Sequence, residues 1–231
     1  TALIVCMQYL HHLRLAENDA WHAPLRQQVF HDAVERGGLI NSLRVEPELG
    51  SPARGGLPDT VASRCADGWD INGHKIYTTG IEGLRWLAVW ARSDDNPPRV
   101  GTWLVPGDSA GISVVKSWDH AGMRATGSHE VIFRHVRVAA ENAVDVWPVD
   151  APPAAQAEPL RLFANRQTAL LAAIYDGIAR AAHHWLVRWL TGRVPAGLGH
   201  PLSRLPRVQE KVGQIAGLLL VNRCLLEQAA A

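Results

Sequence analysis

Two side chains in the first half of the chain, Tyr77 and Thr79, have the types and the spacing to contact one flat ligand. They lie in the run GWDINGHKIYTTG (residues 68–80), whose β-branched and aromatic residues favour an extended backbone. On a strand, residues i and i+2 share one face and lie about 6.5–7 Å apart. We therefore expect an aromatic ring and a hydroxyl group side by side, which suits a flat ligand with a polar edge. The alternative is a half-buried strand with an ordinary packed Tyr.

A loop with a Gly-Ser pair is the second candidate site. Glu46, Pro47, Gly50 and Ser51 follow an expected strand at residues 39–45. Backbone N–H groups at such a loop can point at an anion or a carbonyl oxygen. Gly50 and Ser51 are therefore candidates for substrate binding, and a plain strand-to-loop turn is the alternative.

Three arginines are candidates for contacts with anionic groups. Arg124 lies in the run GMRATGS (residues 122–128), whereas Arg188 and Arg193 lie near the end of a long expected helix. A guanidinium binds carboxylate and phosphate oxygens in a bidentate manner. The alternatives are a turn role for Arg124 and a favourable interaction with the helix dipole for the other two.

The histidines and cysteines do not form a metal-binding pattern. The chain has eleven histidines, and four of them form two adjacent pairs, His11–His12 and His183–His184. Both pairs lie on expected helices. Adjacent helical residues point about 100° apart, so neither pair can chelate a metal from one face. The three cysteines lie far apart and have neither metal nor disulfide spacing. We expect no metal site, and a reducing cytoplasm fits the cysteine usage.

Hydrophobic periodicity divides the chain into three expected parts. Residues 1–36 carry apolar residues three and four apart and predict helices. Residues 37–150 carry short β-branched runs separated by Gly, Pro and Asp, which predict an antiparallel barrel or sandwich. Residues 151–231 begin with a Pro/Ala linker and predict two long helices, the first part of a helical bundle. The fold class is therefore α+β.

The expected elements can be given by number. Asn72-Gly73 predicts a tight turn inside the strand region. The long helices are expected at residues 160–190 and 206–230, and because a bundle needs further helices, we expect more protein or a second subunit to follow. The expected strands are residues 39–45, 61–66, 69–71, 74–79, 86–91, 100–105, 112–115 and 130–138.

This order of elements resembles the acyl-CoA dehydrogenase superfamily, and four motifs occur in the family's order. Residues 46–51 (EPELGS) resemble the T-E-P-x-x-G-S-D loop, and residues 68–79 resemble G-x-x-(I/L)-N-G-x-K-x-W-(I)-T. Residues 122–127 and the strand after them resemble G-x-R-x-S-x-T, and residues 193–209 resemble R-x-x-F-G-x-P-L with a downstream Gln. Together the motifs span most of the chain, which resembles a family member lacking both its ends.

The resemblance implies FAD as the cofactor and assigns residues to it. Tyr77 would pack against the flavin where the family has Trp, with the Thr79 hydroxyl near N5 and Thr78 between them. Val45 stands where the family has a Thr beside the flavin. Arg193, or its rival Arg188, would reach the cofactor pyrophosphate of the partner subunit.

The resemblance also implies an acyl-CoA or another small molecule as the substrate, contacted by Gly50, Ser51 and Arg124. The family Asp after Gly-Ser is Pro52 here, which removes a backbone donor. Neither family position for the carboxylate base offers a candidate, because the one within the chain falls near Gln167 or Thr168. The catalytic base is therefore unassigned. A homodimer or homotetramer and an electron acceptor or flavin reductase are the implied partners.

Three functions are weighed. The first is α,β-dehydrogenation of an acyl-CoA. The second is a reduced-flavin-dependent monooxygenase of the same fold, similar to dibenzothiophene monooxygenase, with FMN as a possible cofactor and His11 or His12 acting at the flavin. The third is a non-enzymatic flavoprotein that binds DNA or a protein through the basic residues 161–231, which hold nine Lys/Arg against three acids.

Composition argues against two classes of partner. The basic third lacks the aromatic interleaving of a nucleic-acid groove, and the net charge of the chain is only +1. These two features argue against nucleic acid as the main partner, although DNA binding stays the third alternative. No apolar run approaches the ~18 residues of a membrane helix, so no membrane span is expected.

Overall fold

The computed structural model describes residues 2–19, 21–49, 56–150 and 157–230, with the side chains of residues 157–160 left aside. Its contacts divide the chain into two compact units, Thr1–Phe163 and Ala164–Ala231, which are described separately. The domain limits expected after residues 36 and 150 stay a prediction.

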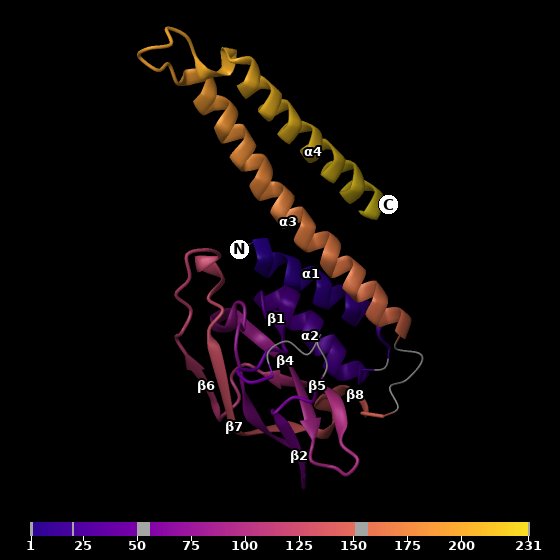
Figure 1. Cartoon of the computed structure of the whole chain (residues 1–231). Helices are drawn as coiled ribbons and strands as arrows, with labels where there is room; N and C mark the ends of the chain where they lie inside the picture. The colour runs from indigo at the N-terminus through magenta and orange to yellow at the C-terminus, as the bar shows by residue number, and fades with distance from the viewer. Residues whose placement is uncertain (1, 20, 50–55, 151–156, 231) are drawn as a thin grey trace. The chain divides into compact units, whose positions relative to one another are not determined.

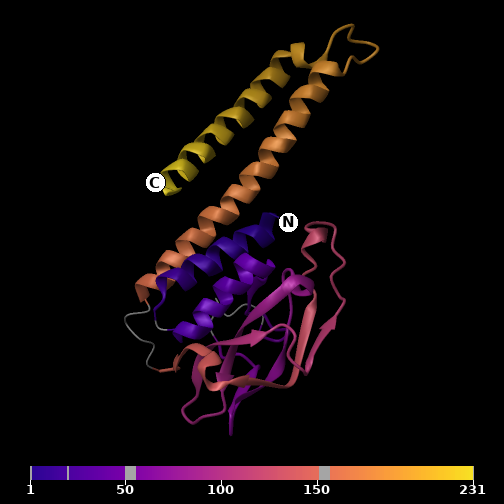
Figure 2. The same ribbon diagram turned by 180° about the vertical axis from the view of Figure 1, so that it is seen from behind.

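Two helices begin the first unit. Helix α1 spans Ala2–Glu17 and helix α2 spans Ala23–Arg36. Pro24 lies in the first turn of α2, where its missing N–H has no intrahelical partner to lose, and Gly37 ends the helix with a left-handed φ of 63°. Both helices lie on the same side of the sheet (Figure 1), and the reverse view agrees (Figure 2).

The strands form one eight-stranded sheet in the order β6-β7-β3-β2-β4-β5-β8, with β1 paired to β4. The order of helices, sheet and long helices confirms the α+β class. The strands are β1 Leu39–Leu43, β2 Val61–Cys65, β3 Gly68–Lys75, β4 Leu84–Ser93, β5 Arg99–Pro106, β6 Ile112–Val115, β7 Glu130–Ala139 and β8 Ala143–Pro148.

The expectation of a purely antiparallel sheet is wrong. β4 runs parallel to both β1 and β2, whereas the other strand pairs in the described ranges are antiparallel. A parallel pair needs a long crossover connection, and the β2–β3 segment between β1 and β4 provides it. β8 was also not expected, because its short run precedes a Pro-rich stretch without a turn signal.

The tight turn expected at Asn72-Gly73 is also wrong, because both residues lie inside β3. The hairpin turn falls at residues 66–67, where Cys65 pairs with Gly68. The Asn72 side chain accepts a hydrogen bond from His135 N at 2.8 Å across a register shift with β7. A Cβ on Gly73 would lie 2.3 Å from Thr60 Oγ1, so close packing rather than a turn requires this glycine.

Two hydrophobic clusters bury both faces of the central strands. In the first, Trp69 of β3 meets Trp103 of β5 edge to face at 5.3 Å, although these strands are not neighbours in the sheet. The sheet must therefore curl around this cluster. In the second, Trp86 of β4 packs beneath α2, where the buried Asp32 accepts its Nε1–H at 3.1 Å. The curled sheet and its two helices form the frame of the site.

The second unit contains most of α3 (Ala157–Gly192) and all of α4 (Pro206–Ala230). The two helices run side by side in both views (Figures 1 and 2). Arg180 of α3 pairs with Asp176 at 2.5 Å and donates to Leu219 O of α4 at 2.7 Å, which fixes the pair. Among the described residues, no helix is both long enough and apolar enough to cross a membrane.

Candidate functional site

The segment after β3 changes direction at Tyr77. Ile76 N donates to Val45 O at 3.0 Å, which makes a single bridge between the two segments. Tyr77 then has a left-handed φ of 57°, an uncommon conformation for a residue other than glycine. The expectation that Tyr77 and Thr79 share a strand face is therefore wrong, because Thr79 N instead donates back to Tyr77 O at 2.9 Å.

This turn places three consecutive side chains in different environments. The Tyr77 ring is 56% exposed, whereas Thr78 is buried. The Thr78 hydroxyl has no hydrogen-bond partner in the part of the chain that the structure describes. The Thr79 hydroxyl lies 3.0 Å from Ser128 Oγ, which lies 2.8 Å from Thr126 Oγ1. The result is an exposed ring beside a row of three hydroxyl groups.

A cavity of about 160 Å³ opens beside this ring. The centres of the Trp118 and Tyr77 rings lie 6.3 Å apart in an edge-to-face arrangement. The centres of the Trp118 and His120 rings lie 4.0 Å apart. Neither Trp118 nor His120 was a sequence candidate, although both come just before the GMRATGS run. The lining residues are Ile76, Tyr77, Ser117, Trp118, His120, Ser128 and Glu130.

A buried ion pair holds the start of the Gly-Ser loop. Lys75 Nζ lies 2.6 Å from Glu46 Oε1 and 2.6 Å from Trp90 O. The Glu46 carboxylate also accepts hydrogen bonds from Asp59 N and from both the N–H and the hydroxyl of Thr60. Every polar side-chain atom of the pair therefore has a partner. The pair joins the loop after β1 to the last residue of β3.

The two charges of this pair are kept at neutral pH. Burial alone would raise the pKa of Glu46, but hydrogen bonds from Lys75 and Thr60 hold it below its usual value. Burial lowers the pKa of Lys75 to about 8, although Glu46 raises it. The pair therefore positions backbone rather than exchanging protons.

A second network joins α1 to the Tyr77–Thr79 segment. Asn41 Nδ2 donates to Thr79 O at 3.0 Å, so its Oδ1 faces His11 Nε2 at 3.2 Å. This orientation makes Nε2 the donor and leaves Nδ1 of His11 without its proton. Burial, with a smaller contribution from Arg14, lowers the pKa of His11 to about 4. His11 is therefore a neutral imidazole close to the proposed site.

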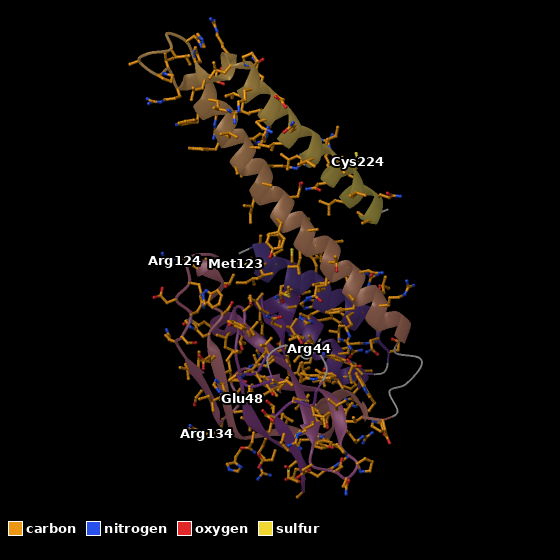
Figure 3. All side chains as sticks on the ribbon, viewed as in Figure 1. Arg44, Glu48, Met123, Arg124, Arg134 and Cys224 are labelled. Atoms are coloured by element: carbon orange, nitrogen blue, oxygen red, sulfur yellow. The ribbon has the colours of Figure 1, made fainter. Side chains whose placement is uncertain are left out.

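Several sequence candidates are not among the residues that line this cavity. Arg124 lies exposed in the segment that joins β6 and β7, beside Met123 (Figure 3). Arg188 and Arg193 are exposed in the second unit. Gly50 and Ser51 lie outside the described residues. His12 Nδ1 bonds to Gln8 O at 2.8 Å within α1, so that nitrogen is already engaged.

Comparison with known proteins decides the family. Residues 45–136 match the family model of the acyl-CoA dehydrogenase middle domain. The putative acyl-CoA dehydrogenase YdbM of Bacillus subtilis is 31% identical over 214 residues, covering 92% of this chain and 53% of that protein. The chain belongs to the acyl-CoA dehydrogenase superfamily.

Other relatives support the family and the fold. The rat mitochondrial short-chain specific acyl-CoA dehydrogenase is 29% identical over 187 residues, which is 80% of this chain and 43% of that one. FMN-bound TdsC from Paenibacillus superposes with a TM-score of 0.82 at 23% identity, over 98% of this chain and 58% of that chain.

A glutaryl-CoA dehydrogenase from Mycobacterium smegmatis in complex with FADH2 superposes with a TM-score of 0.77 at 22% identity, over 97% of this chain and 54% of that chain. This acyl-CoA dehydrogenase-like chain thus spans about half the length of the relatives it matches.

Proposed function

We propose that this chain is the flavin-binding part of an oxidoreductase that removes hydrogen from the α and β carbons of an acyl-CoA thioester, with FAD as the acceptor. One observation carries the proposal: the exposed Tyr77 ring stands beside the hydroxyl groups of Thr79, Thr126 and Ser128. This patch lies within the residues that match the acyl-CoA dehydrogenase middle domain.

The residues present fit a flavin. A flat tricycle needs an aromatic wall, which Tyr77 and Trp118 offer, and polar partners at one edge, which the threonine and serine hydroxyls offer. The buried Thr78 hydroxyl lacks a partner among the described residues, so a polar ligand atom would satisfy it. When bound, the flavin supplies the hydride acceptor.

The remaining assignments belong to the proposal as well. The backbone pairing of Val45 with Ile76 supports a contact of Val45 with the flavin. Arg193, with Arg188 as its rival, would hold the cofactor phosphates of the partner subunit through a guanidinium fork. Gly50, Ser51 and Arg124 would contact the thioester substrate.

The proton-abstracting base is not assigned to a residue. The Thr168 hydroxyl donates to Ala164 O at 2.9 Å, and Asp176 is engaged by Arg180. Gln214 donates to Glu210 at 3.2 Å, on the surface of α4. Thr168, Asp176 and Glu210 thus each have a partner among the described residues, so none of the three is proposed as the base.

A second candidate, a reduced-flavin-dependent monooxygenase, is favoured by His11. The neutral imidazole is linked through Asn41 to Thr79, and its unprotonated Nδ1 would accept a hydrogen bond from a polar group at the flavin edge. The similarity in fold to FMN-bound TdsC supports this candidate and makes FMN the alternative cofactor.

One set of measurements with the full-length protein separates the candidates. The bound flavin is identified as FAD or FMN after extraction, and the protein is titrated without oxygen with a panel of acyl-CoA thioesters. Bleaching of the flavin absorbance supports dehydrogenation. A requirement for added reduced flavin and oxygen supports the monooxygenase, and salt-sensitive duplex DNA binding without either activity would contradict both.

A further inference from the structure

Arg44 is a partly buried cation without an acidic partner among the described residues. It follows β1, and its guanidinium lies 4.3 Å from the centre of the Trp90 ring, which in turn lies 5.8 Å from the Trp147 ring. Figure 3 marks its position in the first unit. Arginine cannot lose its proton to escape burial, so such a charge is costly unless something pairs with it.

The neighbouring charged groups do not supply that partner. Arg14 is already paired with Asp145 at 2.9 Å, and Lys75 is paired with Glu46. His11 is neutral at pH 7 because burial lowers its pKa to about 4. Within the described residues, the group formed by Arg44, His11 and these two ion pairs therefore carries one uncompensated positive charge, and it sits on Arg44. Burial, reinforced by Arg14, lowers the pKa of Arg44 to about 10, as expected for a desolvated cation.

A second arginine in the same sheet shows what an ordinary stacked arginine looks like. Arg64 lies 4.2 Å from the centre of the Trp69 ring, which is the same type of contact. Its side chain is exposed, so water solvates its charge. Arg44 has the aromatic contact but lacks that degree of solvation, so stacking by itself does not account for its place.

Arg44 also lies next to the residues of the proposed flavin site. It directly precedes Val45, whose carbonyl pairs with Ile76 N. His11, whose ring is close enough for Arg44 to affect its pKa, is linked through Asn41 to Thr79. An anion at Arg44 would therefore be held close to the site without occupying it.

We propose that Arg44 binds the free carboxylate of an acyl thioester whose chain ends in a second acid group. This inference rests on the proposed function and narrows its substrate class. A single uncompensated charge matches a monoanion better than a phosphate, and the guanidinium fork matches a planar carboxylate. The rings of Trp90 and Trp147 provide apolar surface for the methylene groups that lead to it.

The test compares two five-carbon ligands, glutaryl-CoA and valeryl-CoA, which differ in the terminal carboxylate. Binding to the full-length protein is measured by calorimetry without oxygen and with the flavin kept reduced, so no hydride transfer occurs. Wild type should bind glutaryl-CoA about 10- to 100-fold more tightly, which is the range for a hydrogen bond between charged groups. R44Q should remove this preference by weakening glutaryl-CoA alone, and R44K should keep part of it. R64Q is the matched control and should behave as wild type.

The outcomes separate the two proposals. Equal affinity of wild type for both ligands, no binding of either, or an equal loss of both in R44Q would overturn the role of Arg44. If R44Q does not fold, the wild-type preference and its partial loss in R44K decide the question. If glutaryl-CoA binds through Arg44 but neither thioester bleaches the oxidised flavin, the proposed dehydrogenation fails while this site stands.

Discussion

Lys75 and Glu46 form an ion pair of 2.6 Å whose two side chains are almost completely withdrawn from solvent. The residues lie 29 positions apart in the sequence, yet the pair joins the end of β3 to the loop after β1. The Trp90 carbonyl accepts from Lys75, and Thr60 donates to Glu46 through its N–H and its hydroxyl. Both charges are therefore compensated next to the candidate site.

Removing one member of this pair should destabilise the first unit. E46Q or K75M leaves the other charge buried and unpaired, so we expect a loss of about 3–5 kcal/mol in the free energy of unfolding. The double variant E46L/K75M should lose clearly less than the sum of the single variants. Denaturant unfolding followed by tryptophan fluorescence measures this. K116M, which breaks the exposed Lys116–Glu82 pair, is the control and should leave stability nearly unchanged.

Below pH 7, the stability of the protein should change with pH in two steps. The folded pKa of His11 is about 4, below the unfolded value of about 6.5. The unfolded chain therefore takes up a proton first, and stability should fall as the pH drops from about 6.5 to about 4. The pKa of Glu46 is also lowered, so its stabilisation is complete above its unfolded pKa and is lost below that as the carboxylate protonates.

Two histidine variants test whether His11 causes the step between pH 6.5 and pH 4. H11Q should flatten the dependence between pH 6.5 and 4 and keep the loss at lower pH. H31Q removes an exposed histidine of α2 and should keep the wild-type profile. An unchanged slope in H11Q would show that His11 is not neutral in the folded state. Chemical unfolding at a series of pH values provides the measurement.

Substitutions at the aromatic wall should weaken flavin binding. Y77A removes an aromatic contact and T79V removes one hydroxyl, and we expect each to raise the flavin Kd about 2- to 10-fold. Y77W and T79S should retain most of the affinity because they keep the ring and the hydroxyl. Flavin fluorescence during titration of the flavin-depleted protein gives the Kd. Y9A changes an exposed ring on α1 and should leave the Kd unchanged; an equal effect of Y9A and Y77A would refute the placement.

Replacing glycine by alanine should change the free energy of unfolding in opposite directions at two positions. A Cβ on Gly101 of β5 would lie 1.9 Å from Asp145 O, and this backbone atom of β8 cannot move away without breaking the pairing. We expect G101A to cost about 1–3 kcal/mol or more. Gly177 of α3 has no atom within 4 Å of such a Cβ, so G177A should stabilise the helix by about 1 kcal/mol. Thermal unfolding followed by circular dichroism tests both, and a destabilised G177A would contradict the open environment.

The positions of most elements could be predicted because the signals are local. The long helix at residues 206–230 agrees with α4, and the strand at residues 112–115 agrees with β6. That Asn72-Gly73 continues a strand and forms no turn could not be predicted locally, because it depends on contacts with Thr60, just before β2, and with His135 of β7. The parallel pairing of β1 with β4 depends on a connection of about forty residues, which periodicity does not describe.

The sequence by itself determined which residues were candidates for the site. Tyr77, Thr79 and the GMRATGS run have types and spacings that follow from local chemistry, and their order resembles the family's. Only the tertiary structure decided how they meet, because each decisive contact joins residues distant in sequence. Thr79 meets Ser128 across 49 residues and Asn41 across 38. In the part of the chain that the structure describes, Arg44 lacks an acidic partner because Asp145 and Glu46 are engaged by other cations. Burial and charge balance are properties of all neighbours at once, so they appear only when the chain is folded.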